Sequence, residues 1–330
     1  MSQKELYDIT IIGGGTTGLF AAFYSSMRDM KVKLIEANSE LGGKVLQFFP
    51  EKLIYDVGGF PNISGDELVE KMKEQANQHQ PKIILNELIE EINRQEEGHF
   101  QLTSKEGKEH YSKTILLATG MGNFTINGPE FNEDWLSSIH HSISHLEKYD
   151  GKNVFISSNN RVGIDWALAL EPIANAVFLV NPNQDFQHAS KEELKKLQQS
   201  TVEIRTETSI SELIGSDGKV DQVIIEDNQG KKEELAVEDI FVYHGVQLNP
   251  IPTPKWGVES DKGRIIVDQF MVTSQAGMFA AGDAVIYPGK TMLIASGYSE
   301  VVTAINSAKK YIEPKASSQV YSTILYRNKN

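Results

Sequence analysis

The sequence predicts an α/β fold of two domains, in which the second domain is inserted in the first. A glycine-rich turn joins a predicted strand to a predicted helix within residues 7–24, and the same strand–turn–helix pattern begins again at Gly151. A later apolar strand, which ends in Gly282-Asp283, is expected to complete the first domain. Strands and helices that alternate in this way form parallel sheets covered by helices. We therefore expect two Rossmann-like three-layer domains.

The domain boundaries follow from this repeat. We expect the first domain to comprise residues 1–118 and 250–330, and the second to comprise residues 119–249. The chain of 330 residues is long enough for two domains, because a domain usually has about 100–200 residues. Residues 248–254 contain three prolines and are interpreted as the segment that returns to the first domain.

The first glycine-rich turn has the spacing of a dinucleotide site. Gly13, Gly15 and Gly18 fit the pattern G-x-G-x-x-G. The first glycine permits a tight turn, the second lets a pyrophosphate approach the backbone, and the third lets the helix pack on the strand. The helix start offers free N–H groups and a positive dipole end to the phosphates. Glu36, at the end of the next strand, can accept hydrogen bonds from ribose hydroxyls. The alternative is an ordinary glycine turn.

The composition excludes several classes of function. With 45 acidic and 32 basic side chains the formal net charge is −13, so a nucleic acid partner, which needs a basic face, is not expected. No apolar run reaches the roughly 18 residues of a membrane helix, and the N-terminus lacks the apolar core of a signal peptide. We therefore expect a cytoplasmic protein without a membrane partner. There is no cysteine, so any redox chemistry must come from a bound cofactor.

Other segments place small, aromatic or acidic residues where they can meet a ligand. Two glycines in Leu41-Gly42-Gly43-Lys44 let the backbone pass close to something flat or charged. Phe49, just before a proline, is a candidate for stacking on a ring, whereas Phe48 is as compatible with the core. A buried strand ends in Ala118-Thr119-Gly120, whose small residues can touch a ligand. Asp283 can accept hydrogen bonds from cofactor hydroxyls.

Two further patterns have structural interpretations. Ser64–Asn77 has apolar residues at helical spacing, and Ser64 with Glu67 predicts a capping box at its start. His141 and His145 have the spacing of two metal ligands, but no third ligand is evident, and we interpret their segment as a polar linker. The sequence has no Ser–His–Asp pattern and no metal motif, so no metal site is expected.

The three landmarks together resemble a known family. The glycine motif with Glu36, Ala-Thr-Gly at 118–120 and Ala-Gly-Asp at 281–283 look like those of flavoproteins with two dinucleotide-binding domains, whose first domain holds FAD. Within them, nearly the whole chain closely resembles the bacterial ferredoxin–NADP reductases of the thioredoxin-reductase-like type. The absence of cysteine fits, because this family lacks the Cys pair of thioredoxin reductases. The resemblance is carried by Leu41–Gly43, Tyr55–Pro61, Asp165–Leu168, Leu170–Ala174, Leu293–Gly297 and Tyr321–Thr323.

The resemblance implies an FAD site in the first domain. Its expected cofactor-binding residues are Gly13, Gly15, Thr17, Gly18, Glu36, Lys44, Phe49, Leu88, Phe124, Asp283 and Thr323. The family usually has Gln at Lys44 and Tyr at Phe49, and a phenylalanine can still stack but loses the phenol hydrogen bond. Phe49 and Tyr321 are the implied stacking residues, with Tyr321 supplied by the second subunit of a homodimer. No catalytic side chain is expected, because the flavin carries the chemistry.

The second glycine loop departs from the family pattern. The family reads roughly Gly-Gly-Gly-Asp-Ser-Ala where residues 158–163 read Ser-Asn-Asn-Arg-Val-Gly, and each added Cβ hinders a pyrophosphate. Residues 181–188 lack the arginines that hold the 2′-phosphate in the family, and Asp185 would repel it. NADPH binding is therefore expected to be weakened by a few orders of magnitude or lost. The sequence does not clearly provide for NADH binding in its place. Arg161 offers either one phosphate contact or a surface contact.

The resemblance implies an FAD-dependent oxidoreductase that transfers electrons between a pyridine nucleotide and a ferredoxin or flavodoxin. In the family, a hydride passes from the nicotinamide to the flavin, and single electrons then pass to the redox partner. The altered second loop leaves other functions open. One is an FAD-binding protein without turnover, in a sensor or partner-binding role, and another is a flavoenzyme with a different electron donor. A scaffold without flavin is a third alternative.

Overall fold

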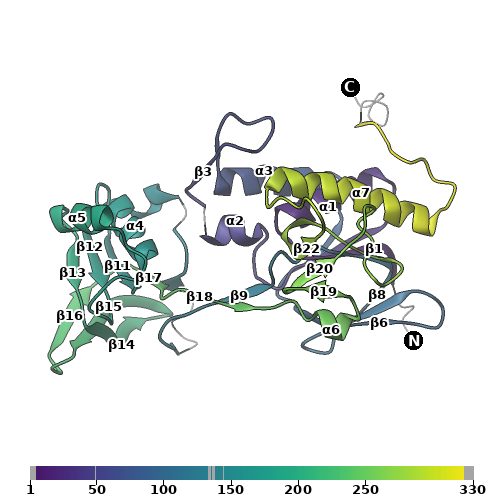
Figure 1. The fold of residues 1–330 in the computed structure, drawn as a ribbon. Helices are drawn as coiled ribbons and strands as arrows, with labels where there is room; N and C mark the ends of the chain where they lie inside the picture. Colours follow the sequence, from purple (N-terminus) through teal and green to yellow (C-terminus); the bar gives the residue numbers. More distant parts are fainter. Residues whose placement is uncertain (1–4, 49, 133–134, 136–137, 144, 323–330) are drawn as a thin grey trace. The chain divides into compact units, whose positions relative to one another are not determined.

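The structure, a computed structural model, describes residues 5–48, 50–132, 135, 138–143 and 145–322 (Figure 1). It separates into two compact units, Met1–Asn123 with Leu248–Asn330, and Phe124–Gln247. The chain passes between them in β9 (Asn123–Ile126) and β18 (Val246–Asn249), which pair as a two-stranded sheet. The second unit is thus inserted in the first, as the sequence predicts.

The first unit is built on a mainly parallel sheet in the order β5-β2-β1-β8-β7-β6, with β21 also paired to β8. Strands β1, β2, β5, β8 and β21 run parallel, whereas β6 and β7 form antiparallel pairs that extend the sheet beyond β8. The strands are β1 (Leu6–Ile12), β2 (Val32–Ile35), β5 (Lys82–Ile84), β6 (Ile89–Arg94), β7 (Phe100–Ser104), β8 (Glu109–Leu117) and β21 (Met278–Ala280).

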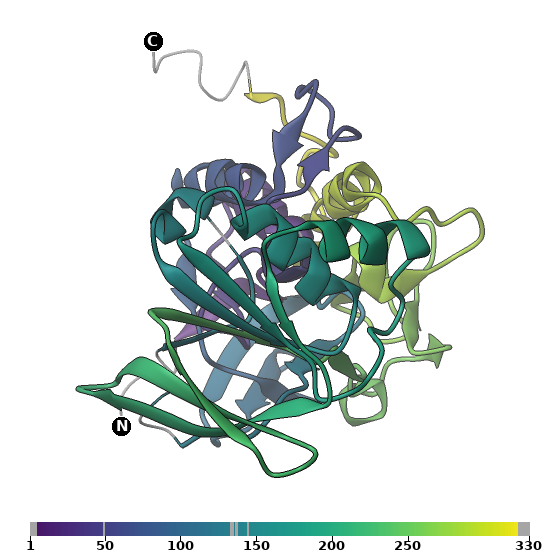
Figure 2. The same cartoon turned by 90° about the vertical axis from the view of Figure 1, so that its left-hand side faces the viewer.

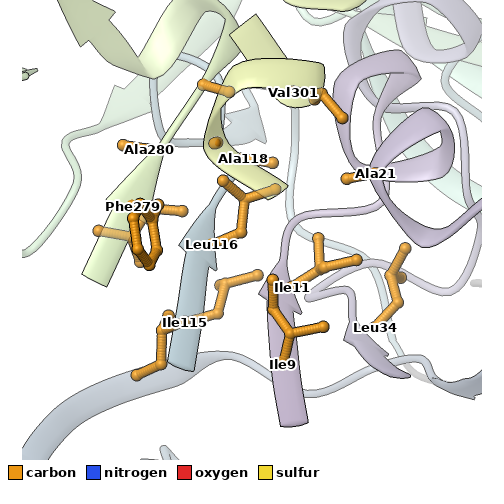
Figure 3. Close-up of a cluster of buried hydrophobic side chains, with 14 of the residues drawn as sticks. Ile9, Ile11, Ala21, Leu34, Ile115, Leu116, Ala118, Phe279, Ala280 and Val301 are labelled. Atoms are coloured by element: carbon orange, nitrogen blue, oxygen red, sulfur yellow. The ribbon is translucent and has the colours of Figure 1, made fainter. Parts of the chain in front are cut away.

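Three long helices pack with this sheet around one apolar core. They are α1 (Thr16–Met27), α3 (Gly65–Asn77) and α7 (Ile294–Ile312), and α1 contacts both of the others. Figure 3 shows side chains of β1, β8 and β21 in one buried cluster with Ala21 and Val301. Burying each large aliphatic side chain contributes about 1.5–3 kcal/mol, so this cluster fixes the carboxyl ends of the strands relative to the start of α1.

Shorter elements complete the first unit. They are α2 (Gly43–Phe48), β3 (Leu53–Ile54), β4 (Ile63–Ser64), α6 (Thr253–Trp256), β19 (Ser260–Asp261), β20 (Arg264–Ile266), η3 (Gly282–Ala284) and β22 (Val285–Ile286). Within the part of the chain that the structure describes, no helix has the length and apolar content needed to cross a lipid bilayer.

The capping box predicted at Ser64 is wrong, although α3 itself is present. Ser64 is the N-cap residue, but its side chain accepts no hydrogen bond from the helix. Its hydroxyl donates instead to the carboxylate of Asp66, which also accepts from the Glu67 N–H at 2.7 Å. Asp66 therefore takes the place that the sequence pattern assigns to the serine, because its carboxylate is the stronger acceptor.

The second unit, which faces the viewer in Figure 2, has three layers. A parallel sheet in the order β10-β17-β11-β12-β13 lies between helices α4 and α5 and an antiparallel sheet of β14, β15 and β16. Its elements are β10 (Ile139–His140), η2 (Leu146–Tyr149), β11 (Asn153–Ser158), α4 (Arg161–Leu170), β12 (Ala176–Val180), α5 (Lys191–Gln199), β13 (Glu203–Arg205), β14 (Thr208–Ser216), β15 (Lys219–Asp227), β16 (Lys232–Ala236) and β17 (Asp239–Tyr243).

Candidate functional site

The turn between β1 and α1 depends on two glycines. Gly13 has a φ of +104°, in the left-handed region, and a Cβ there would lie 2.5 Å from the Ala118 carbonyl oxygen. A Cβ at Gly18 would lie only 1.8 Å from the Gly13 carbonyl oxygen. These contacts are backbone contacts, so no side-chain movement can relieve them. The absence of side chains at both positions lets α1 start directly against the end of β1.

The start of α1 is an open helix end. Its N-cap residue is Gly15, no side chain caps the helix, and its first turn contains no acidic residue. The turn at Gly42 and Gly43 packs against it, since the Gly42 N–H donates to the Gly14 carbonyl at 2.9 Å and a Cβ at Gly43 would lie 2.9 Å from Gly15 Cα. Two glycine turns thus expose backbone around a helix N-terminus, which suits a pyrophosphate.

Glu36 is held in a fixed orientation beside this turn. The residue is 6% exposed, and its Oε2 accepts a hydrogen bond from the Gly14 N–H at 2.6 Å. Its Oε1 accepts from the backbone N–H and the side-chain amide of Asn38, both at 2.9 Å. A carboxylate has about four acceptor positions, so these three bonds leave capacity for a ribose hydroxyl.

The Ala-Thr-Gly and Gly-Asp segments meet the glycine turn. The Thr119 hydroxyl is buried and has no hydrogen-bond partner in the structure. Thr17, in the first turn of α1, faces two more glycines, because a Cβ at Gly282 or Gly297 would lie 2.5 or 2.8 Å from its Oγ1. Added side chains would fill this space, and the unpaired Thr119 hydroxyl is an atom that a ligand can satisfy. The residues therefore fit a bound dinucleotide.

Lys44 and Asp283 form an ion pair at this site. The Lys44 Nζ lies 2.5 Å from the Asp283 Oδ2, and the two side chains are 34% and 24% exposed. The sequence predicts that both residues lie at the cofactor, but it does not predict that they contact each other. The pair joins α2 to the Gly282-Asp283 turn, so the residues that follow β2 and β21 are tied together.

Sequence reasoning missed Glu300, which supports the Gly282-Asp283 turn. This residue of α7 is 4% exposed, and its Oε2 accepts from the Gly282 N–H at 2.7 Å. Its Oε1 accepts from the Tyr287 hydroxyl at 2.7 Å and from the Lys290 Nζ at 2.5 Å. Burial, followed by the Glu300 carboxylate, raises the pKa of Tyr287 to about 12. The signal in the sequence is an acid on the apolar face of a helix, next to Val301 and one turn after Gly297.

The segment that carries Leu88 is tied to the end of β2. The Glu87 and Asn86 N–H groups donate to the carbonyls of Glu36 and Asn38, both at 3.0 Å. Glu87 is 2% exposed and binds His110 and Lys108. Burial opposes ionisation of the Glu87 carboxyl, but the hydrogen bonds from His110 and then Lys108 outweigh it and hold its pKa below the ordinary value. The residue before Leu88 is thereby bonded to the end of β2, while the predicted role of Leu88 at the cofactor stays a prediction.

The remaining expected site residues are Tyr321, Phe124, Phe49 and Thr323. Tyr321 follows α7 in the chain and is 55% exposed, with its hydroxyl bonded to the Gln319 amide. Phe124 is the first residue of the second unit. Phe49 and Thr323 lie outside the described residues, and their roles stay predictions.

The turn that precedes α4 in the second unit is closed by the chain itself. The N-cap residue Asn160 accepts a hydrogen bond from the Val162 N–H at 3.0 Å through its side-chain oxygen. The Arg161 N–H donates to the Gln187 carbonyl at 2.9 Å, and the Gln187 N–H donates to the Asn159 carbonyl at 2.8 Å. Two N–H groups at the start of α4 are therefore already bonded, in contrast to the uncapped start of α1.

The packing inside this turn also differs from that of the first glycine turn. Ser158 and Gly163 have the same spacing as Gly13 and Gly18 in the first unit. Ser158 is fully buried, and a Cβ at Gly163 would lie 2.3 Å from its Cβ. The serine that replaces the first glycine thus occupies the space beside the third. The Arg161 Nε lies 2.6 Å from the Glu193 Oε1, so the structure places this side chain in a surface ion pair.

The histidines singled out in the sequence make ordinary structural contacts. The His141 Nδ1 lies 2.9 Å from the Val242 carbonyl oxygen, and the His145 Nδ1 lies 3.4 Å from Glu147. Across the described ranges of the chain, no three His, Cys, Asp or Glu side chains gather as a metal site.

A family model described as pyridine nucleotide-disulphide oxidoreductase matches residues 7–308. The chain belongs to this family. It is 43% identical over 319 residues to ferredoxin–NADP reductase 1 of Listeria monocytogenes, covering 96% of each chain, and 40% identical over 332 residues to ferredoxin–NADP reductase 2 of Bacillus subtilis, covering 99% of each. These relatives place it among the bacterial ferredoxin–NADP reductases, as the sequence resemblance indicates.

A solved structure shows the same fold. The Lactococcus lactis thioredoxin reductase superposes with a TM-score of 0.57 at 22% identity, and the match covers 93% of this chain and 99% of that one. This family of oxidoreductases uses FAD, and the open turn at Gly13–Gly18 has the geometry that such a cofactor requires. The chain is therefore an FAD-dependent oxidoreductase with the thioredoxin reductase-like fold.

Proposed function

We propose that this protein is a reductase that transfers electrons through FAD to a redox protein in the cytoplasm, and that its second unit binds NADPH weakly or not at all. The names of the relatives, ferredoxin–NADP reductases, support the reaction class. The closed turn before α4 supports the loss of nucleotide binding. In this proposal the first unit holds FAD, and the second keeps the fold of a nucleotide-binding domain without its phosphate site.

The residues of the first unit have defined tasks in this proposal. The uncapped start of α1 binds the pyrophosphate, Glu36 binds a ribose, and Thr17, Lys44 and Asp283 surround the rest of the cofactor chain. The resemblance assigns Leu88 to the flavin end and Tyr321 of a second subunit to the ring. Its other assignments are Phe124, in the second unit, and Phe49 and Thr323, which lie outside the described residues. FAD supplies hydride and single-electron transfer when it is bound, and the chain supplies its position and electrostatic surroundings.

The observation that carries the proposal is the hydrogen bonding at the start of α4. A pyrophosphate there would have to displace the Asn160 side chain from Val162 and the Gln187 carbonyl from Arg161. The segment 181–188 also offers no arginine to a 2′-phosphate. Two missing charge-assisted hydrogen bonds correspond to about 3–6 kcal/mol, or about 10²- to 10⁴-fold in affinity.

The proposed partners follow from the assignment of this protein as a reductase. A ferredoxin or a flavodoxin is the proposed electron acceptor, on the strength of the relatives' names. We also propose a homodimer in which Tyr321 of one subunit covers the flavin of the other, and its 55% exposure leaves the ring free for such a contact. An FAD-binding protein without turnover is the second candidate, and the closed α4 turn favours it over an ordinary NADPH-dependent enzyme.

Anaerobic stopped-flow mixing tests this function. We expect the purified yellow protein to lose flavin absorbance rapidly with dithionite but only slowly with millimolar NADPH or NADH, because neither nucleotide docks productively. Rapid bleaching that saturates at micromolar NADPH would contradict the proposal. Reoxidation of the dithionite-reduced protein by a ferredoxin would favour a reductase with another donor, whereas its absence would favour the second candidate.

A further inference from the structure

A buried polar network in the first unit includes none of the residues assigned to the cofactor. It consists of Lys33 on β2, Glu87 between β5 and β6, and His110 on β8, which are 5%, 2% and 8% exposed. The His110 Nε2 contacts the Glu87 Oε1, and the His110 Nδ1 lies 3.3 Å from the Lys33 Nζ. Both ring nitrogens of His110 are therefore occupied, one by a carboxylate and the other by an amine.

The two partners of His110 determine which ring nitrogen carries the proton. A lysine ammonium has three N–H donors and no acceptor, so the Nδ1 beside Lys33 has to accept a hydrogen bond. The ring proton then lies on Nε2, from which it donates to the Glu87 carboxylate. His110 is thus a neutral ring with one acceptor and one donor, which face Lys33 and Glu87 respectively.

The surroundings of Lys33 favour its ammonium form, although burial opposes it. Burial lowers the pKa of Lys33, and the negative charges of Glu5 and Glu87 oppose this effect. Its Nζ also lies 4.1 Å from the centre of the Tyr7 ring, whose face attracts a cation. A charged Lys33 leaves His110 able to donate only through Nε2.

The backbone of Glu87 connects this network to the cofactor site. Its N–H donates to the Glu36 carbonyl at 3.0 Å, and the Glu36 carboxylate accepts from the Gly14 N–H in the glycine turn. We propose that His110 is a positioning residue for FAD: by donating to Glu87, it holds the residue that supports Glu36, and it does not itself touch the cofactor. The proposal rests on the FAD assignment and not on the state of the second unit.

Lys108 provides a matched control, because it binds the other oxygen of the same carboxylate. Its Nζ lies 3.1 Å from the Glu87 Oε2, but its side chain is 62% exposed, so water can replace it. Lys108→Gln should therefore change the FAD affinity by less than about twofold. The effect of the buried donor is thereby compared with that of an exposed donor to the same group.

Dilution of the FAD-loaded protein tests the proposal, with the return of flavin fluorescence as the measure of the dissociation constant. His110→Asn has a shorter side chain, whose amide does not reach the position of Nε2, and it should weaken FAD binding by about 2- to 30-fold. His110→Gln places an amide donor near that position and should restore most of the affinity. In a Glu87→Met background, His110→Asn should have no further effect, because the carboxylate that His110 bonds is then absent.

Several results would overturn the proposal. They are wild-type FAD affinity in His110→Asn, an equal loss of affinity in His110→Gln, and an undiminished loss from His110→Asn in the Glu87→Met background. Thermal melting of each variant checks folding.

A measurement on the wild-type protein does not depend on the folding of any variant. Nitrogen NMR of the histidine-labelled, FAD-loaded protein, with the ring signals of His110 assigned through its backbone, should show the proton on Nε2 and a free lone pair on Nδ1. A proton on Nδ1, in a neutral or a charged ring, would contradict the proposed contact order between Lys33, His110 and Glu87.

The outcome is independent of the proposed loss of NADPH binding. Bleaching of the flavin by NADPH would contradict that proposed function and leave the dissociation of FAD measurable. A wild-type protein that does not bind FAD would instead contradict the FAD assignment on which this inference rests.

Discussion

Gly18→Ala should destabilise the apoprotein by about 3 kcal/mol or more and abolish FAD retention. The new Cβ would lie 1.8 Å from the Gly13 carbonyl oxygen, so either α1 must move away from β1 or the turn must open. Overpacking of a well-packed interior commonly costs about 1–3 kcal/mol, and a backbone clash has no flexible side chain to absorb it. Urea denaturation of the apoprotein and the FAD content after purification measure the two effects.

Gly15→Ala is the matched control for this prediction. At Gly15 φ is −71°, and the nearest atom to an added Cβ is 3.8 Å away, so the apoprotein should stay within about 1 kcal/mol of wild type. Its FAD affinity should still fall by at least about tenfold, because the second glycine of the motif is where the pyrophosphate approaches. A Gly18→Ala apoprotein as stable as wild type would show that α1 does not depend on this contact.

Glu300→Ala should cost about 3–5 kcal/mol of unfolding free energy and also weaken FAD binding. It would leave the Lys290 ammonium, 5% exposed, buried without its counter-ion, which is the expensive way to break a buried ion pair. The Gly282 N–H would lose its acceptor as well, so the turn that presents Asp283 would be less well fixed. Chemical denaturation measures the loss of unfolding free energy, and an FAD titration measures the loss of affinity.

A double variant separates the effect of the unpaired buried charge on stability from the effect of the lost contact with the Gly282 N–H. In Glu300→Ala with Lys290→Met, the unpaired ammonium is absent, so we expect part of the stability to return while FAD binding stays weak. Glu313→Ala serves as the surface control, because its pair with Lys309 is at the end of α7 and Glu313 is 56% exposed, so about 0.5 kcal/mol or less should be lost. Equal losses in Glu300→Ala and Glu313→Ala would refute the supporting role of Glu300.

Features that depend on local sequence could be predicted in this protein. The strand–turn–helix pattern predicted within residues 7–24 is present, because the glycine turn does join β1 to α1. Spacing alone is enough for Gly18, because the atom that its missing side chain would meet is the Gly13 carbonyl oxygen in the same turn. The positions of Glu36 and Asp283 could also be predicted from local sequence. Glu36 directly follows strand β2, and Asp283 lies in the turn that follows β21.

Features that depend on distant partners could not be predicted. Glu300 lies on the apolar face of a helix, and only the fold shows that Lys290 and the Gly282 N–H meet it there. The pairing of Asn159 with Gln187 joins two polar loops, each of which is equally compatible with solvent exposure. The capping box at Ser64 failed because Asp66 competes for the same backbone group, and spacing rules do not rank such competitors.

The two glycine loops show how the same fold gives an open site in one unit and a closed one in the other. Gly15 and Asn160 are the N-cap residues of α1 and α4, and both have extended backbone conformations. The asparagine side chain bonds the helix start that the glycine leaves open. The Asn160 side chain and the Gln187 carbonyl each bond an N–H group at the start of α4, whereas no side chain caps the start of α1.

We propose that the start of α4 is not available to a nucleotide phosphate. A calorimetric titration of NADP⁺ into the FAD-loaded protein tests it most directly, with the Bacillus subtilis relative as the reference under the same conditions. We predict no binding up to millimolar NADP⁺, because the Asn160 side chain and the Gln187 carbonyl already bond the N–H groups of Val162 and Arg161. Micromolar affinity for NADP⁺, or an affinity equal to the one measured for the relative in parallel, would contradict this proposal.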